Sequence, residues 1–237
     1  MALFGFGKKK KEAQAAAQKA AEEARIAAEK KVAEDAAMVD AAAYTVTDDA
    51  SAKAALRQGM DLYRERMYAP ALTLLQKAAE HGLAEAQYKL AGMYDNGYSV
   101  ERSYAEAVKW YRAAAQQGHA KAQFNLGVMY DNGYGVEQSH AEALKWFRAS
   151  AQQGHARARH NLGVMFFEGQ GVEKNYVVAA EWYRSAAKQG IAESQFNLGK
   201  MYKEGLRVKK SKEEAAKWLR AAADQGHAAA RSTLKEL

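Results

Sequence analysis

The chain has 237 residues with one proline and no cysteine, and it carries 35 Lys or Arg against 28 Asp or Glu, a formal net charge of +7. The lack of cysteine excludes disulfides, thiol nucleophiles and thiolate metal sites. No apolar run approaches the roughly 20 residues that a membrane-spanning helix needs. The single proline and the alanine-rich, periodic pattern predict an all-α protein.

The chain opens with two segments that differ from the rest. Residues 1–11 combine apolar side chains with four lysines at 8–11, the reverse of the charge order in a secretory leader, so a cytoplasmic protein is expected. Residues 12–51 form the second segment, of which 12–43 is rich in Ala, Glu, Lys and Gln. Its larger apolar side chains are too few for a coiled-coil seam, so we expect a solvated or partly ordered helix followed by a linker at 44–51.

From residue 52 onward the sequence repeats. Glycines and tryptophans recur every 36 residues without insertion or deletion. A fixed period of this size indicates a solenoid, in which each helical unit buries its apolar face by stacking on its neighbours. The pattern divides this part into a unit at 52–82, four repeats at 83–226 and a half-repeat at 227–237. The residues interpreted as structural repeat positions are Gly118, Gly154, Gly190, Trp110, Trp146, Trp182 and Trp218.

Each repeat is predicted to contain two helices joined by a turn. Ser103, Ser139 and Ser211 are each followed three residues later by a Glu, which predicts a capping box at the start of the second helix. Asn175 takes this place in the third repeat. Glycines in register are expected to end both helices in the left-handed conformation. These are Gly97, Gly133, Gly169 and Gly205 for the first helices, and Gly118, Gly154 and Gly190 for the second.

Small residues inside the helices indicate that the two helices of a repeat pack closely. Gly127, Gly163 and Gly199 lie within the predicted first helices. Glycine at such a place costs about 1 kcal/mol relative to alanine, and a close helix–helix contact would offset that cost. On the second helix, alanine recurs in the same way, at Ala107, Ala143, Ala179 and Ala215.

Two segments carry a resemblance to a known family. They are AKAQFNLGVMYDNGYGV at 120–136 and ALKWFRASAQQGH at 143–155. They closely resemble the Sel-one-like repeat family, a branch of the tetratricopeptide-like α-solenoids, whereas residues 52–82 look like a tetratricopeptide unit. The resemblance implies a right-handed superhelix of antiparallel helix pairs and a non-catalytic adaptor that assembles protein complexes, often in bacteria. Cysteine-rich relatives act on β-lactams, an activity not carried over to a chain without cysteine.

A candidate binding surface follows from this resemblance. Asn125, Asn161 and Asn197 share one register on the first helix, which lines the concave face in tetratricopeptide-like solenoids. An amide both donates and accepts hydrogen bonds, which suits the backbone of an extended peptide. Bonds between neighbouring helices are the alternative role for these asparagines. The flanking side chains would favour an acidic peptide or a C-terminal carboxylate; they are Lys89, Lys121, Arg157, Arg159 and His160.

Other functions have less support in the sequence. We expect no catalytic residues, metal, cofactor or small-molecule substrate, because the histidines are spread over different repeats and no acid–base pattern recurs. A membrane-surface adaptor is one alternative, with residues 1–11 at the inner face of an anionic membrane. Nucleic-acid binding through the basic stretch 209–220 is the other, although no basic–aromatic motif accompanies it.

Overall fold

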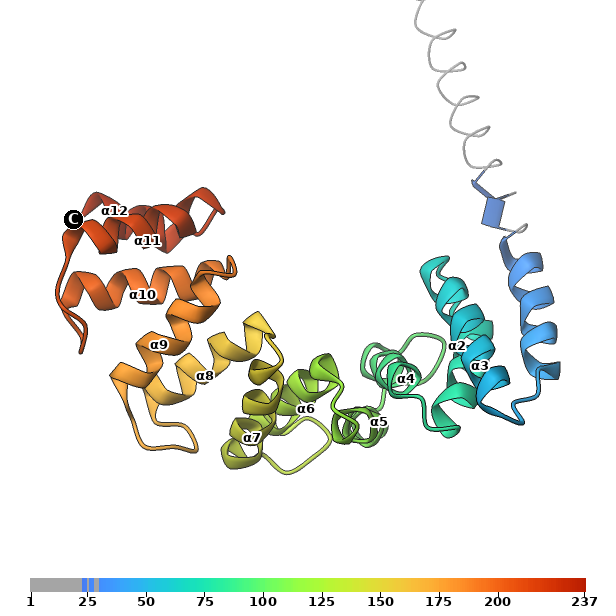
Figure 1. Cartoon of the computed structure of the whole chain (residues 1–237). Coiled ribbons are helices and arrows are strands. Elements are labelled where there is room, and N and C mark those ends of the chain that lie inside the picture. Colours follow the sequence, from blue (N-terminus) through green and yellow to red (C-terminus); the bar gives the residue numbers. More distant parts are fainter. Residues whose placement is uncertain (1–22, 25, 28–29) are drawn as a thin grey trace, which may run out of the picture. The chain divides into compact units, whose positions relative to one another are not determined.

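A computed structural model describes residues 23–24, 26–27 and 30–237, and Figure 1 gives its course. Every regular element in these residues is a helix, and they contain no strand. The chain divides into two compact units, residues 1–81 and 82–237. The predicted all-α fold is therefore confirmed. The segment 1–11, expected to meet a membrane in one alternative, lies outside the described residues.

The first unit is built on a helix pair, α2 (Asp49–Arg64) and α3 (Tyr68–Glu80). α2 begins inside the segment expected to be a linker. Its start is fixed by a reciprocal capping box, in which Asp48 accepts from the Ser51 N–H at 2.8 Å and Ser51 Oγ accepts from the Asp48 N–H at 3.1 Å. The linker is thus reduced to the few residues before Asp48.

The helix that precedes this pair is attached to it at one end. Residues 30–43 are helical, and Lys77 of α3 donates from Nζ to the carbonyls of Ala41 and Ala42 at 2.8 and 3.0 Å. The Ala41 side chain is fully buried. Val32 and Val39 on the same helix are 69% and 72% exposed, so most of its length is solvated, as the thin apolar stripe predicts.

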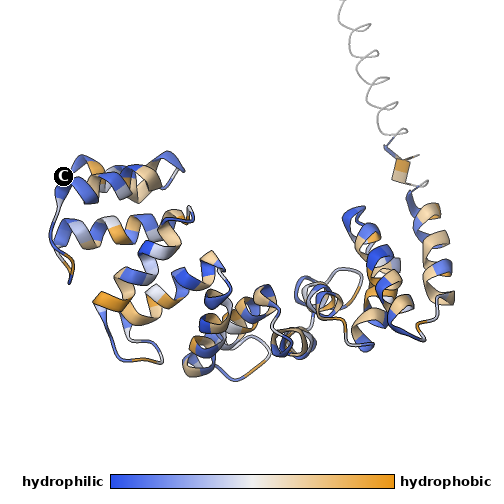
Figure 2. Ribbon diagram, in the orientation of Figure 1, coloured by the Kyte–Doolittle hydropathy of each residue, from blue (hydrophilic) through white to orange (hydrophobic). Residues whose placement is uncertain are grey.

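The second unit alternates two kinds of helix (Figure 1). Each helix packs against the next one along the chain, and hydrophobic and hydrophilic residues alternate along them (Figure 2). The first helices of the repeats are α4 (Ala84–Asn96), α6 (Ala120–Asn132), α8 (Ala156–Glu168) and α10 (Ala192–Glu204), followed by the terminal α12 (Ala228–Lys235). The second helices are α5 (Tyr104–Gln116), α7 (His140–Gln152), α9 (Tyr176–Ala187) and α11 (Lys212–Asp224).

The glycines inside the first helices make the close contacts that the sequence predicts. A Cβ atom on Gly163 would lie 2.5 Å from Cδ1 of Tyr183, and one on Gly127 would lie 2.7 Å from Cδ1 of Phe147. The fourth repeat has the same arrangement with Leu219. All of the contacting side chains are buried. The residue after each tryptophan therefore fills the core between the two helices of its repeat.

The tryptophans occupy a more peripheral position. Each is half-buried and packs against the edge of a core cluster. The lysine before Trp146 covers its outer face, with Nζ of Lys145 5.3 Å from the ring centre. The tryptophans thus pack at the margin of each core, and the deepest position is held by the next residue.

The prediction of capping boxes at the second helices is confirmed only in part. Ser103 Oγ accepts from the Glu106 N–H at 3.3 Å, as predicted. The Ser103 N–H, however, donates to the Tyr94 carbonyl at 3.0 Å, and the Glu106 carboxylate pairs with Lys109 at 3.2 Å. The turn between the helices brings a backbone acceptor to the cap, so the glutamate is not needed there. The same backbone bond recurs at Ser139, Asn175 and Ser211.

Three first helices begin with a histidine cap. Nδ1 of His155 accepts from the Ala158 N–H at 3.3 Å, and its ring stacks on Phe124 with ring centres 4.5 Å apart. His119 and His227 cap and stack in the same way. These histidines therefore join each first helix to the first helix of the repeat before it.

Glutamine amides at the ends of the second helices form a second joint between repeats. Nε2 of Gln153 donates to the Gly118 carbonyl and to Oε1 of Gln123, both at 2.8 Å. Gln117 bonds Gly82 and Gln87 in the same way. Each joint satisfies polar groups that a purely apolar interface would leave without partners.

We predict that Gly163→Ala destabilises the protein whereas Gly92→Ala, one register position later in the first helix of the first repeat, does not. The added methyl group at 163 would overlap the Tyr183 ring, and overpacking costs about 1–3 kcal/mol. At position 92 the nearest atom is Oη of Tyr111 at 3.7 Å, so the gain of up to about 1 kcal/mol in helix propensity is retained. Urea unfolding of both variants measures whether each change lowers or raises the free energy of unfolding. Equal effects would contradict the steric explanation.

We also predict that His155 makes stability depend on pH. Burial, assisted by Arg157 and Lys121, lowers the pKa of His155 from its usual 6.5. Below pH 6.5 the unfolded chain therefore takes up the proton first, and the free energy of unfolding falls as the pH falls. His155→Asn keeps a cap that does not titrate. Urea unfolding at neutral and mildly acidic pH should show a smaller loss for this variant than for the wild type; equal losses would contradict the prediction.

Candidate functional site

Each of the three asparagines lines a separate hollow along the first helices of the second unit. Asn125 on α6 borders a space of about 140 Å³ with Asp95 and Tyr134. Asn161 on α8 borders about 470 Å³ with Arg157. Asn197 on α10 borders about 250 Å³. All three asparagine side chains are half-buried. Each of the three asparagines therefore lies at a hollow, but the Asn161 hollow includes residues of the following repeat, whereas the other two do not.

Asn125 is engaged by the protein itself. Its amide bonds the hydroxyl of Tyr111 on α5, and that hydroxyl donates to Oδ2 of Asp95 at 3.3 Å. Burial, together with the nearby Asp95 carboxylate, raises the pKa of Tyr111, so the phenol stays protonated. Burial also raises the pKa of Asp95, and the bond from Tyr111 opposes that effect. The amide thus belongs to a network between neighbouring helices, the alternative role named above.

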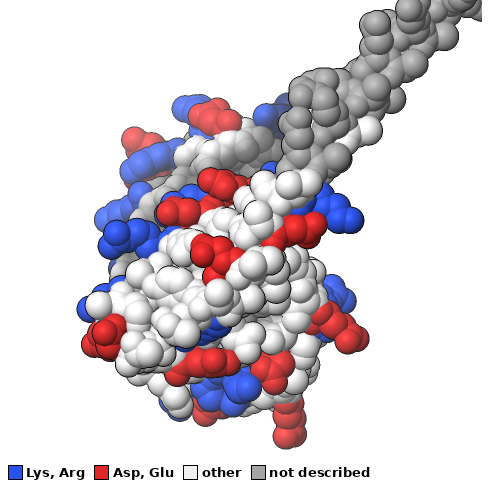
Figure 3. Space-filling model, turned by 90° about the vertical axis from the view of Figure 1, so that its right-hand side faces the viewer, with Lys and Arg blue, Asp and Glu red and all other residues white. Residues whose placement is uncertain are grey.

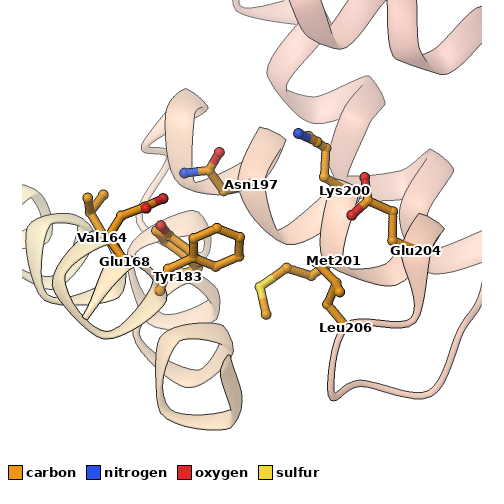
Figure 4. Close-up of a pocket in the computed structure, with 9 residues that line it drawn as sticks. Val164, Glu168, Tyr183, Asn197, Lys200, Met201, Glu204 and Leu206 are labelled. Carbon is orange, nitrogen blue, oxygen red and sulfur yellow. The ribbon is translucent and has the colours of Figure 1, made fainter. Parts of the chain in front are cut away.

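Asn197 has an equivalent partner. Its amide bonds the hydroxyl of Tyr183 on α9. Burial raises the pKa of Tyr183, and the Glu168 carboxylate adds to the effect. Figure 4 shows Asn197 above the Tyr183 ring, with Glu168 beside it. One donor of this amide is therefore used within the protein.

Asn161 differs from the other two. The ring at the matching position on α7 is Phe147, which has no hydroxyl. The side chain of Asn161 makes no hydrogen bond within the part of the chain that the structure describes. Its amide can therefore offer two donors and a carbonyl acceptor to an external partner. Of the three predicted asparagines, Asn161 is therefore the one whose amide has all of its hydrogen-bonding groups available to a partner.

The predicted basic residues differ in their surroundings. Arg157 lies in the Asn161 hollow and is exposed, as is Lys121, and both act on the pKa of His155. Lys89 lies with Nζ 5.5 Å from the centre of the Tyr88 ring. On the face drawn in Figure 3, Lys and Arg are interspersed with Asp and Glu.

Arg159 is turned into the repeat joint. Its Nε donates to the Ala151 carbonyl at 3.2 Å and Nη1 donates to Oγ of Ser185 at 3.0 Å. It occupies the register of the buried Gln123 and Gln195, which make the same bond to a carbonyl eight residues earlier. The 36-residue register of these glutamines was the signal that could have separated Arg159 from the binding residues.

His160 is held by a neighbouring repeat. Its Nδ1 lies 2.8 Å from Oγ of Ser194, and the side chain lines the Asn161 hollow together with Glu193. Burial lowers the pKa of His160, and Glu193 opposes this shift. The imidazole is therefore neutral near pH 7, and the positive charge at this hollow comes from Arg157.

Sequence reasoning missed the tyrosine hydroxyls and two glutamates. The position after each tryptophan reads Tyr111, Phe147, Tyr183 and Leu219 along the chain, and this variation decides which asparagine has a partner. The two glutamates, Glu168 and Glu204, line the Asn197 pocket, and at their register the first two repeats carry asparagine.

The alternative sites are only partly covered by the structure. In the basic stretch, Lys212 donates to the Leu237 carbonyl at 2.8 Å and Lys217 pairs with Glu214 at 3.3 Å, so both are engaged within the chain. No helix among the described residues is long and apolar enough to cross a membrane. Those residues also contain no cluster of three or more potential metal ligands from His, Cys, Asp and Glu.

The repeats match a known family model. The model, described as the Sel1 repeat, covers residues 69–83, 84–119, 120–155, 156–191 and 192–227. The chain belongs to the Sel1 repeat family. Each complete Sel1 match starts at the first residue of a first helix, at α4, α6, α8 and α10. The three asparagines therefore hold one position of the Sel1 repeat.

Solved structures share this architecture. The Sel1 repeat protein from Oxalobacter formigenes is 37% identical with a TM-score of 0.72, over 77% of this chain and 72% of that one. The protein c5321, described as a protective antigen of uropathogenic Escherichia coli with an SLR fold, is 37% identical with a TM-score of 0.76. That match covers 86% of this chain, which spans only 43% of c5321.

A more distant likeness concerns the fold alone. YrrB, described as a TPR protein with an unusual peptide-binding site, is 22% identical with a TM-score of 0.51, over 77% of this chain and 91% of that one. No functionally curated protein matches the chain. Sel1 and TPR-like repeats are a general scaffold for protein interactions, and the chain has this fold.

Proposed function

We propose that this Sel1 repeat protein is a non-catalytic adaptor that binds an extended segment of a partner protein along its first helices. The observation that carries the proposal is Asn161, whose half-buried amide has no partner among the described residues and borders a hollow of about 470 Å³. An extended backbone presents one N–H and one C=O per residue, which is the pair that a free amide can bond.

The other two asparagines support the same surface in a different way. Asn125 and Asn197 each use one donor on a tyrosine hydroxyl, which leaves a second N–H and the carbonyl oxygen. The tyrosine bond fixes the orientation of each amide before a partner binds. A fixed amide loses less conformational freedom on binding, so two ordered positions flank one open position in the proposed groove.

The charges near Asn161 favour an acidic residue in the bound segment at that place. Arg157 and Lys121 are exposed, and Arg157 lines the hollow. Arg binds carboxylates with two parallel hydrogen bonds, which gives geometry as well as energy. Glu193 lies on the opposite wall, so the preference is for one carboxylate near Arg157 rather than for a uniformly acidic segment.

We further propose a cytoplasmic location and a bacterial setting. The two similar structures at 37% identity come from bacteria, which supports the bacterial setting. No observation on the described residues favours membrane or nucleic-acid binding over a protein partner, so these remain alternative outcomes of the experiment below.

The first experiment identifies the partner protein. The wild type and Asn125→Ala/Asn161→Ala/Asn197→Ala are compared by affinity capture and mass spectrometry, after circular dichroism has shown equal folding. A purified protein captured only by the wild type is then divided into peptides for titration. Recovery of nucleic acid or lipid in place of protein would contradict the adaptor proposal.

With that peptide, we predict that Asn161→Ala weakens binding about 5- to 30-fold. The variant removes about two hydrogen bonds to the peptide backbone, each contributing about 0.5–1 kcal/mol. Gln152→Ala, an exposed polar change on α7, is the matched control and should leave the affinity unchanged. Isothermal titration measures both. An unchanged dissociation constant for Asn161→Ala would place the peptide elsewhere.

We also predict that Phe147→Tyr weakens the same peptide about fivefold. The added hydroxyl would take one of the two Asn161 donors, as the hydroxyls of Tyr111 and Tyr183 do for Asn125 and Asn197, and the amide would have one hydrogen bond of about 1 kcal/mol fewer to offer the peptide. Phe147→Leu carries the residue of the fourth repeat and adds no hydroxyl. Titration of both variants separates the effect of the hydroxyl from that of a changed core, because a core effect would also appear with leucine.

A further inference from the structure

The pocket beside Asn197 is enclosed on several sides (Figure 4). It has a volume of about 250 Å³ and lies among residues of α8, α9 and α10 and the turn after α10. Its apolar walls come from Val164, Phe167, Met201 and Leu206. The equivalent space beside Asn125 is about 140 Å³. The fold therefore provides a larger side-chain pocket at this end of the groove.

One of the residues that differ between the two pockets lies at the register of Leu206. At the register of Leu206, the second repeat has Tyr134, whose ring stacks on Tyr104 with ring centres 5.2 Å apart. Tyr104 and Tyr134 both line the smaller pocket. Leucine is shorter than tyrosine and leaves the space beside Met201 open. The larger pocket is thus a property of particular residues rather than of the repeat.

Two carboxylates lie at this pocket without an ionic partner. Glu168 and Glu204 are exposed, line the pocket, and form no ion pair within the part of the chain that the structure describes. The first two repeats carry Asn96 and Asn132 at this register, and each bonds a carbonyl of its own helix at 2.7 and 2.9 Å. The acidic pair therefore marks this pocket specifically.

We propose that the Asn197 pocket takes a lysine or arginine side chain of the bound segment. The methylene stem of such a residue would cover the apolar walls, while its cationic head would remain at the exposed carboxylates of Glu168 and Glu204. Asn197 would bond the backbone of the same residue. This inference rests on the proposed function, since it names a side chain of the segment that the adaptor binds.

Lys200 lies at the same pocket and opposes this charge preference. Its Nζ is 5.8 Å from the centre of the Phe196 ring, and it forms no ion pair within the described residues. The charged side chains lining the pocket are thus two carboxylates and one ammonium group, a net charge of −1. Removal of Lys200 would strengthen the attraction for a cationic head, whereas removal of the glutamates would weaken it.

The experiment selects peptides from a randomised library displayed on phage with the full-length chain, then titrates synthetic copies. We expect enrichment of Lys or Arg at one position. Glu168→Gln/Glu204→Gln should weaken the basic peptide about 2- to 30-fold, as expected for two exposed ion pairs, and Lys200→Gln should strengthen it. A peptide with norleucine in place of the basic residue keeps the stem but not the charge, and should bind wild type and variants equally.

Glu181→Gln/Glu213→Gln is the matched control, because both side chains are exposed on second helices and the change in net charge is the same. An equal loss with this pair would show a general charge effect and overturn the inference. Peptides that depend on Asn161 but not on Glu168 and Glu204 would overturn it while the adaptor function stands. Failure to enrich any peptide would overturn both.

Discussion

The contact between a glycine of the first helix and a ring or leucine of the second helix is the constraint on which the repeats depend. At Gly127, Gly163 and Gly199 no other residue fits without displacing the facing side chain. The contact fixes the distance between the helices of a repeat, and so it fixes where the far end of the ring emerges. That end reaches the next first helix, where the asparagines lie. The core residue that faces the glycine therefore affects both the packing of its repeat and the asparagine on the next first helix.

This coupling explains why the three asparagines are not equivalent. Tyrosine at the core position gives the next asparagine a hydroxyl partner, as for Asn125 and Asn197, whereas Phe147 gives Asn161 none. A single oxygen atom in the core thus decides whether a surface amide is fixed or free. Residues that appear to serve only packing can in this way set the binding chemistry of a solenoid.

The fold could be read from the sequence to the extent that it depends on local or periodic signals. Glycine ends, serine caps and small core residues follow from one register, and the structure contains them. The role of Glu106 was mispredicted because the competing acceptor, the Tyr94 carbonyl, comes from the other helix of the repeat. The state of Asn161 and the role of Arg159 depend on residues in other helices. Such partners become visible only when the helices are placed side by side.

The glutamine joints have a consequence for how such proteins change in length. Gln117 and Gln153 each bond the carbonyl of the glycine that ends the preceding unit and a glutamine of their own repeat, so a repeat gained or lost between them would meet an identical partner. Recombination there would lengthen or shorten the array without orphaning a polar group. At the third repeat Arg159 bonds the Ala151 carbonyl of the preceding repeat, and its other partner, Ser185, belongs to its own repeat. The preceding unit thus contributes a backbone carbonyl to each of these joints, and any neighbouring repeat can supply a backbone carbonyl.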